Sequence, residues 1–267
     1  MLPDFYAEPG LNPFRDQVSA NINEAIDPFS GALHLTHIDL VVPGNGGLDI
    51  KIQRSYNSNN VYLSRKTPTN LAPTLTTLLP RSPVGMGWTM HFGRVLKSED
   101  AAGFADICGF GTPVGGDTLG DAILELPDGS QQVLYYNATP FSARFITRDQ
   151  WVADCITGGL LVTSPDGVKY TMTERVGGNS STYSTAMDYA WYTKQITDRN
   201  GNYLIIDYLP VSSGKNALIR KITASDDSSR TVEFTYLDST YPDTVRLDTI
   251  KATGQTCRGL VGTPGIE

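Results

Sequence analysis

The chain has 267 residues, of which 18% are charged, and a formal net charge of −7. This length allows one large domain or two smaller ones with a substantial core, and an acidic balance without a Lys/Arg cluster argues against nucleic-acid binding. The 26 Gly and 16 Pro are typical of a chain with many turns, and no run approaches the ~20 apolar residues of a membrane span.

Residues 1–26 show neither helical nor strand periodicity and contain Pro3, Pro9 and Pro13. We therefore expect an extended N-terminal arm that lies along the main body. The first residues have neither the basic region nor the apolar core of a cleaved signal peptide. Export would need another route or a signal outside this chain.

A glycine-rich stretch, 43–47, joins two apolar-rich arms, 33–42 and 48–56. Apolar and polar residues alternate in the second arm, which predicts an antiparallel hairpin with one dry and one wet face. This hairpin opens an N-terminal β region, 27–120, which also contains a Pro-bearing loop insertion at 57–83.

The alternation of Trp88, Met90 and Phe92 predicts another half-buried strand, in which His91 points toward solvent. The glycines before Trp88 suit a tight bend. We expect the Gly-rich residues 98–120 to form a connecting loop.

Residues 121–267 are predicted to be consecutive hairpins, because short apolar runs flank turns rich in Asp, Asn and Gly, which tolerate positive φ. The predicted strand pairs are 123–126 with 132–135, 160–163 with 168–172, 191–196 with 203–208, and 218–223 with 230–236.

The last two hairpins look like copies of one unit. Ile196 aligns with Ile222, 26 residues later, and Tyr208 aligns with Tyr236, 28 residues later. Residues 247–250 begin a third copy, for which we expect no returning strand. Units of this size are stable only when stacked on neighbours. The chain is therefore expected to be a truncated piece of a longer polypeptide or to end in an unusual cap.

The segments Asp27–Gly31, Pro43–Ile50, Arg54–Ser58 and Gly85–Trp88 resemble the opening segment of bacterial RHS/YD-repeat proteins, and Ile196–Tyr208 resembles the repeat itself. The resemblance implies an all-β fold in which consecutive antiparallel hairpins form a curved sheet or ribbon of YD-type repeats with long loops. It also implies a secreted or cell-surface protein related to polymorphic toxins, in which the ribbon winds into a shell around a toxin domain. The implied partners are further repeats or a toxin domain of the same polypeptide, and carbohydrate, which some members bind.

The sequence offers no clear starting point for chemistry. It has no nucleophile elbow, phosphate loop or zinc-protease motif, and no cofactor motif is found. His34 and His37 fall on opposite faces of a strand and make a poor metal pair. The turn Asp198–Asn202 lacks the remaining ligands of a calcium loop, so a hairpin turn is the simpler interpretation. The odd set Cys108, Cys155 and Cys257 argues against a zinc site or a disulfide framework, although one pair could bridge in an oxidising compartment.

Aromatic side chains are the remaining candidates for a site. Trp151, Trp191 and Tyr183 could stack on sugar rings, although strand aromatics are more often core residues, and the core interpretation is favoured for Trp88 and Trp191. The prediction is a non-catalytic structural segment of an RHS/YD-repeat shell or ribbon. The alternatives are a carbohydrate-binding or adhesive module, and a glycosidase-like enzyme whose carboxylate pair cannot be located from sequence.

Overall fold

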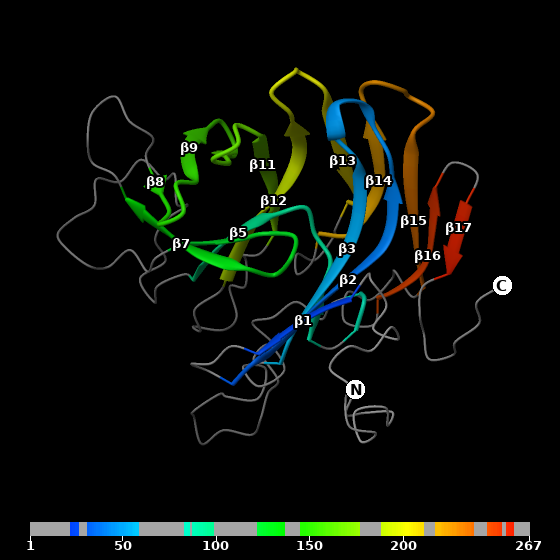
Figure 1. Ribbon diagram of the computed structural model, residues 1–267, viewed down its shortest axis with the longest axis horizontal. Coiled ribbons are helices and arrows are strands. Elements are labelled where there is room, and N and C mark those ends of the chain that lie inside the picture. Colours follow the sequence, from blue (N-terminus) through cyan, green and yellow to red (C-terminus); the bar gives the residue numbers. More distant parts are fainter. Residues whose placement is uncertain are drawn as a thin grey trace, which may run out of the picture.

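The computed structural model describes residues 22–26, 31–58, 83–85, 87–98, 122–136, 145–176, 188–210, 217–237, 245–252 and 255–258. These residues are mostly β strand, arranged in two sheets whose strand pairs are antiparallel (Figure 1). Within these ranges no helix is long and apolar enough to cross a membrane.

The smaller sheet contains the N-terminal strands in the order β1-β2-β3-β4. β2 (Leu33–Val42) and β3 (Ile50–Asn57) pair as the predicted opening hairpin, which is confirmed, with a short 3-10 turn η2 (Asn45–Gly47) between them. β1 (Ile22–Ile26), at the end of the predicted arm, pairs with β2, and β4 (Trp88–Thr89) pairs with β3.

Eight strands of the larger sheet close into a barrel. β5 to β12 each pair with the next strand, and β12 also pairs with β5, which completes the ring. The barrel strands are β5 (Arg94–Ser98), β6 (Ala122–Glu125), β7 (Gln131–Tyr136), β8 (Phe145–Ile146), β9 (Val152–Ile156), β10 (Gly159–Thr163), β11 (Lys169–Val176) and β12 (Asp188–Thr197).

The inward-facing side chains of the barrel form a packed apolar core, as expected for a small barrel in which alternate residues point inward. Trp191, which is 1% exposed, is the largest of them. The buried members of this core are Val95, Ala122, Leu124, Leu134, Phe145, Ala153, Leu160, Val162, Met172 and Trp191.

The same sheet continues past the barrel as a row of hairpin strands, here called the repeat sheet (β12–β17). Its further strands are β13 (Tyr203–Tyr208), β14 (Ile219–Ala224), β15 (Thr231–Leu237), β16 (Arg246–Ala252) and β17 (Gln255–Arg258). β12 belongs to both regions: one edge pairs with β11, and the other pairs first with β5 and then, beyond Thr193, with β13.

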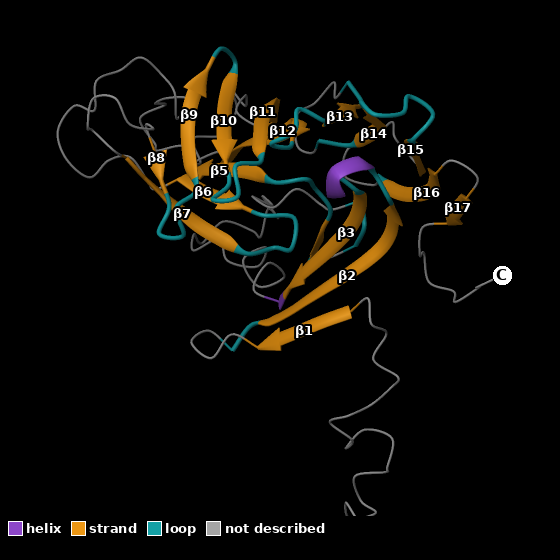
Figure 2. Ribbon diagram, turned by 45° about the horizontal axis from the view of Figure 1, so that its top comes forward, coloured by secondary structure: helices purple, strands orange, loops and turns teal. Residues whose placement is uncertain are grey.

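The small sheet packs on one face of the repeat sheet. In Figure 1 β2 and β3 lie in front of β13 and β14, and Figure 2 shows them as a separate layer. Leu40, Ile50 and Ile52 of the small sheet share a core with residues of β12 to β16, such as Ile222 and Phe234. The described residues therefore form two cores, one inside the barrel and one between the two layers.

All four hairpins predicted downstream of residue 121 are confirmed, as β6–β7, β10–β11, β12–β13 and β14–β15. The closure of eight strands into a barrel and the strands β8 and β9 were not predicted. The third copy does have a returning strand, because β17 pairs with β16, so the expectation that it has none is wrong.

The strand predicted around Trp88 to Phe92 is confirmed at Trp88–Thr89 and wrong beyond it. β4 ends at Thr89 in the small sheet and β5 begins at Arg94 in the barrel, so Met90 to Gly93 form a crossover between the two sheets. Gly93 has a φ of +93°, which breaks the strand and which non-glycine residues rarely adopt. His91, predicted to face solvent, is 3% exposed.

Candidate functional site

The aligned tyrosines of the two repeat hairpins make the same contact. The Tyr208 hydroxyl, at the end of β13, donates to the carbonyl oxygen of Thr193 in β12 at 2.6 Å. The Tyr236 hydroxyl, in β15, donates to the carbonyl oxygen of Ile219 in β14 at 2.8 Å. In each copy, a tyrosine near the end of the returning strand thus holds the first strand of its own hairpin. We call this contact the tyrosine clamp.

The strand geometry around the two clamps is also shared. The register shifts between Asp207 and Tyr208 in one copy and between Thr235 and Tyr236 in the other, which is typical of a β-bulge that re-aims a side chain. Burial raises the pKa of both hydroxyls, so both remain protonated donors at neutral pH. The repeat seen in the sequence is therefore a repeat of side-chain contacts.

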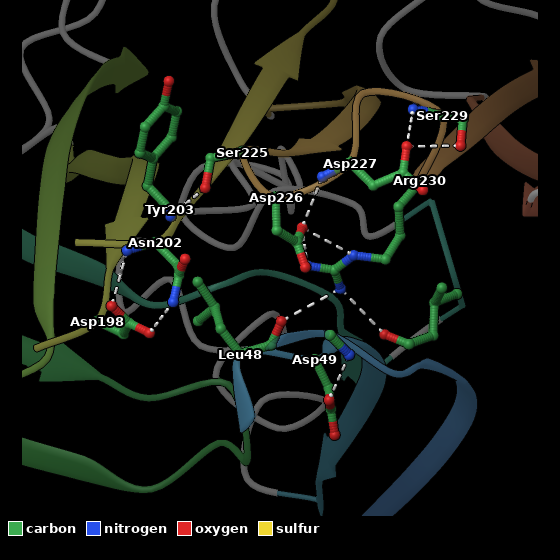
Figure 3. Close-up of polar contacts among 12 residues, drawn as sticks. Leu48, Asp49, Asp198, Asn202, Tyr203, Ser225, Asp226, Asp227, Ser229 and Arg230 are labelled. Carbon is green, nitrogen blue, oxygen red and sulfur yellow. Dashed lines mark hydrogen bonds and ion pairs between the residues drawn. The ribbon is translucent and has the colours of Figure 1, made fainter. Parts of the chain in front are cut away.

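The turns of the repeat hairpins meet the glycine-rich turn of the small sheet (Figure 3). Buried Arg230 is held by Asp226 Oδ1, which is 2.6 Å from Nη2 and 3.1 Å from Nε. Its Nη1 donates to the carbonyl oxygens of Val42 at 3.3 Å and Leu48 at 3.2 Å. A Cβ at Gly44 would collide with the Arg230 guanidinium, so this approach requires glycine.

The two repeat turns are joined to each other and closed by their own side chains. The Tyr203 amide donates to Ser225 Oγ, and the Ser225 amide donates to the Tyr203 carbonyl oxygen, both at 2.8 Å. Asp198 accepts hydrogen bonds from the Asn202 side-chain amide and from the backbone amides of Asn202 and Asn200, each at 2.8 Å, and these bonds lower the pKa of its carboxyl. This network confirms the predicted hairpin turn.

Charged side chains alternate in sign across the outer face of the repeat sheet. Asp207, Lys221, Glu233 and Lys251 stand opposite one another on β13 to β16. Lys221 Nζ is 3.1 Å from Glu233 Oε1, and both side chains are exposed. This face is therefore hydrated, while the opposite face packs on the small sheet.

A buried polar network lies where the barrel meets the two-layer region. Arg94 of β5 donates through Nε to Glu125 Oε2 at 2.7 Å and through Nη1 to the Tyr192 hydroxyl at 2.8 Å. Glu125 ends β6, and Tyr192 lies on β12, so the three side chains stand opposite one another on adjacent strands. His91, in the crossover, has Nε2 3.6 Å from Glu125 Oε1.

The network fixes the charges of its members. Burial alone would raise the pKa of Glu125, but the Arg94 guanidinium lowers it to about 2, so the carboxylate is ionised. Burial and the Arg94 charge lower the pKa of His91 against the opposing attraction of Glu125, so its imidazole is neutral at neutral pH. Arg94 and Glu125 therefore form a buried ion pair beside a neutral histidine.

Of the three predicted sugar-stacking residues, the structure describes Trp151 and Trp191. Trp191 lies inside the barrel with Arg175 against its ring, and its buried indole offers no face to a ligand. Trp151 is half-buried and packs on Tyr170, with ring centroids 5.7 Å apart. Tyr183 lies outside the described residues. Sugar stacking at Trp151 stays a prediction.

Within the described part of the chain, no group of three His, Cys, Asp or Glu side chains is placed to hold a metal ion. His37, on β2, is paired with Asp39 at 2.8 Å, and Asp39 is also held by Arg54. Cys155 is disulfide-bonded. The buried network around Arg94 was missed by the sequence analysis, because its members are drawn from three strands and a crossover.

No protein-family model and no curated protein sequence matches the chain. Among solved structures, it is similar to TcdB2-TccC3, with 15% identity and a TM-score of 0.43 over 81% of this chain and 12% of that chain. It is also similar to the Photorhabdus luminescens Tc holotoxin pore, with 16% identity and a TM-score of 0.45 over 81% of this chain and 11% of that chain. A third is the N-terminal domain of the effector protein SpvB from Salmonella typhimurium, with 12% identity and a TM-score of 0.33 over 80% of this chain and 71% of that chain. The chain thus spans about a ninth of the length of the first two.

Proposed function

We propose that this chain is a non-catalytic structural segment of an RHS/YD-repeat wall or ribbon. The observation that carries the proposal is the tyrosine clamp, which recurs with the same donor, the same kind of acceptor and the same bulge in successive hairpins. A contact that needs one side chain per copy suits a unit that is added many times.

The edge of the repeat sheet supports the same role. β17 is the last strand of the sheet, and no strand of the described residues pairs with its outer edge. Unpaired amide and carbonyl groups on such an edge can accept a further strand. We propose that a further repeat of the same polypeptide pairs there.

A structural role also fits the buried carboxylate. Glu125 is ionised, and its Oε2 is held by two Arg94 nitrogens at 2.7 Å, so it is poorly suited to act as a general acid. By the sequence resemblance, the wall would belong to a secreted or cell-surface protein associated with a toxin domain.

The test is to append a second copy of residues 217–252 after residue 258 and to measure amide hydrogen exchange. If the sheet extends, amides of β17 gain protection and the extended chain unfolds in one cooperative transition. The matched control carries Ser at the appended copy's counterparts of Ile222, Val232 and Phe234, which removes the apolar face and should leave β17 unprotected. Equal exchange at β17 in both extended chains would refute the proposal.

A further inference from the structure

His91 occupies the crossover that carries the chain from the small sheet to the barrel. Within the crossover, Phe92 packs into the core between the two layers, and Arg94 begins β5 directly after Gly93. The crossover meets β12 at Thr193, whose amide and Oγ1 both donate to the Gly93 carbonyl oxygen, at 3.2 and 2.9 Å. This is the point at which the edge of β12 passes from β5 to β13.

The hydrogen bonds of His91 define which form of the imidazole fits this place. Nδ1 accepts the Gly93 amide at 3.1 Å, so Nδ1 carries no proton. The proton of the neutral ring is then on Nε2, which faces Glu125 Oε1 at 3.6 Å without a hydrogen-bond partner. A second proton could only go to Nδ1, where it would point at the Gly93 N–H and break that bond.

Charged and titratable groups face the imidazole from each element packed on it. Arg94 of β5 and Glu125 of β6 form the ion pair, Tyr192 of β12 packs edge-on with ring centroids 6.4 Å apart, and Asp128 lies in the turn after β6. The Glu125 charge is already neutralised by Arg94, so a protonated His91 would add an unmatched positive charge to a buried site.

We propose that His91 is an acid-sensitive latch: the neutral imidazole holds the crossover at Gly93, and its protonation releases the contact between the crossover and β12. The Gly93 amide loses its acceptor in the protonated state. A shift of Gly93 then also disturbs the hydrogen bonds of Thr193, because the Gly93 carbonyl oxygen accepts both of them.

The sign of the pH dependence follows from the preference for the neutral ring. A folded-state pKa below the unfolded value of about 6.5 means that the unfolded chain binds the proton more readily. The stabilisation is complete above pH ~6.5 and is lost as the pH falls from there toward the folded-state pKa. Each pH unit by which folding lowers the His91 pKa changes the folding equilibrium constant by up to about tenfold.

The test compares the wild-type chain with His91→Asn, whose side-chain oxygen can accept the Gly93 amide but does not titrate. Urea unfolding is measured at pH values from about 7.5 to about 5.5, a range in which His is the side chain that ordinarily titrates. The wild type should lose stability on acidification, and His91→Asn should lose much less. His34→Asn, a change on β2 of the small sheet, is the matched control and should behave as the wild type.

A second measurement needs no variant. In the wild type, the His91 ring is titrated by NMR while amide protection factors are followed at Gly93, Thr193 and Ile222. The latch predicts that Gly93 and Thr193 lose protection as His91 protonates, while Ile222 in the repeat sheet keeps its protection. Protonation of His91 with unchanged Gly93 protection, or equal acid sensitivity of His91→Asn and wild type, would overturn the proposal.

Discussion

The barrel (β5–β12) and the repeat sheet (β12–β17) share a strand but satisfy their buried polar groups differently. The barrel wall uses one network of four different side chains, in which Arg94 pairs with Glu125 beside His91 and Tyr192. The strands of the repeat sheet use a neutral hydroxyl and a backbone carbonyl in each copy, and carry Lys221 and Glu233 on the hydrated face, while the buried pair of Arg230 and Asp226 lies in a turn against the small sheet. A network with four members from three strands and a crossover can be built once, whereas a clamp with one side chain can be copied.

Among the variants that compare the two regions, Arg94→Leu is expected to lose the most stability. This change leaves the Glu125 carboxylate buried without its cation, which should cost about 3–5 kcal/mol of the free energy of unfolding. Urea denaturation measures the loss. The double variant Arg94→Leu with Glu125→Met removes both charges and should recover much of it, because a matched apolar pair leaves no buried charge. A single-variant loss as small as that of a surface ion pair would mean that the network does not stabilise the barrel.

An intermediate effect is expected from removing the clamps. Tyr208→Phe and Tyr236→Phe keep the ring and delete one neutral hydrogen bond, so each should cost about 0.5–1.5 kcal/mol. The two losses should be similar, because the contacts are equivalent. Thermal or urea unfolding of both variants measures them, with Tyr203→Phe, a change at an exposed ring, as the near-silent control. Strongly unequal losses would show that the two clamps contribute differently to stability although the copies are alike in sequence.

The smallest effect is expected on the outer face of the repeat sheet. Lys221→Ala removes an exposed pair with Glu233 and should cost about 0–1 kcal/mol, declining with added salt. A double-mutant cycle with Glu233→Ala isolates the pair energy. A coupling as large as the loss at Arg94 would contradict the view that the charged pairs on the outer face of the repeat sheet contribute little to stability.

The hairpins could be predicted from sequence because their signals are local. Alternation in the arms and Asp, Asn or Gly in the turns both lie within about a dozen residues, as in the β14–β15 hairpin around Ile222. The repeat was visible because Tyr208 and Tyr236 align. The clamp itself was not, because its acceptors are backbone carbonyls, which any residue provides.

Barrel closure could not be predicted in the same way. It depends on β12 pairing with β5, for example Trp191 with Val95, and an alternating pattern is the same in an open ribbon and in a closed barrel. His91 was misplaced because the alternation of Trp88, Met90 and Phe92 continues across residues that leave the small sheet after Thr89. Arg94 and Glu125 meet when β5 pairs with β6, and Tyr192 joins them only when β12 closes the barrel.

The shared strand β12 has a consequence for how the protein is made. During synthesis β5 and β11 emerge before β12, and among the described strands each has one edge that pairs with β12 alone. In a nascent chain halted before Asp188, these two strand edges would be unpaired and open to other chains and to chaperones. Once β12 is synthesised, it can pair with both edges. The same strand then provides the edge on which β13 of the first repeat hairpin pairs.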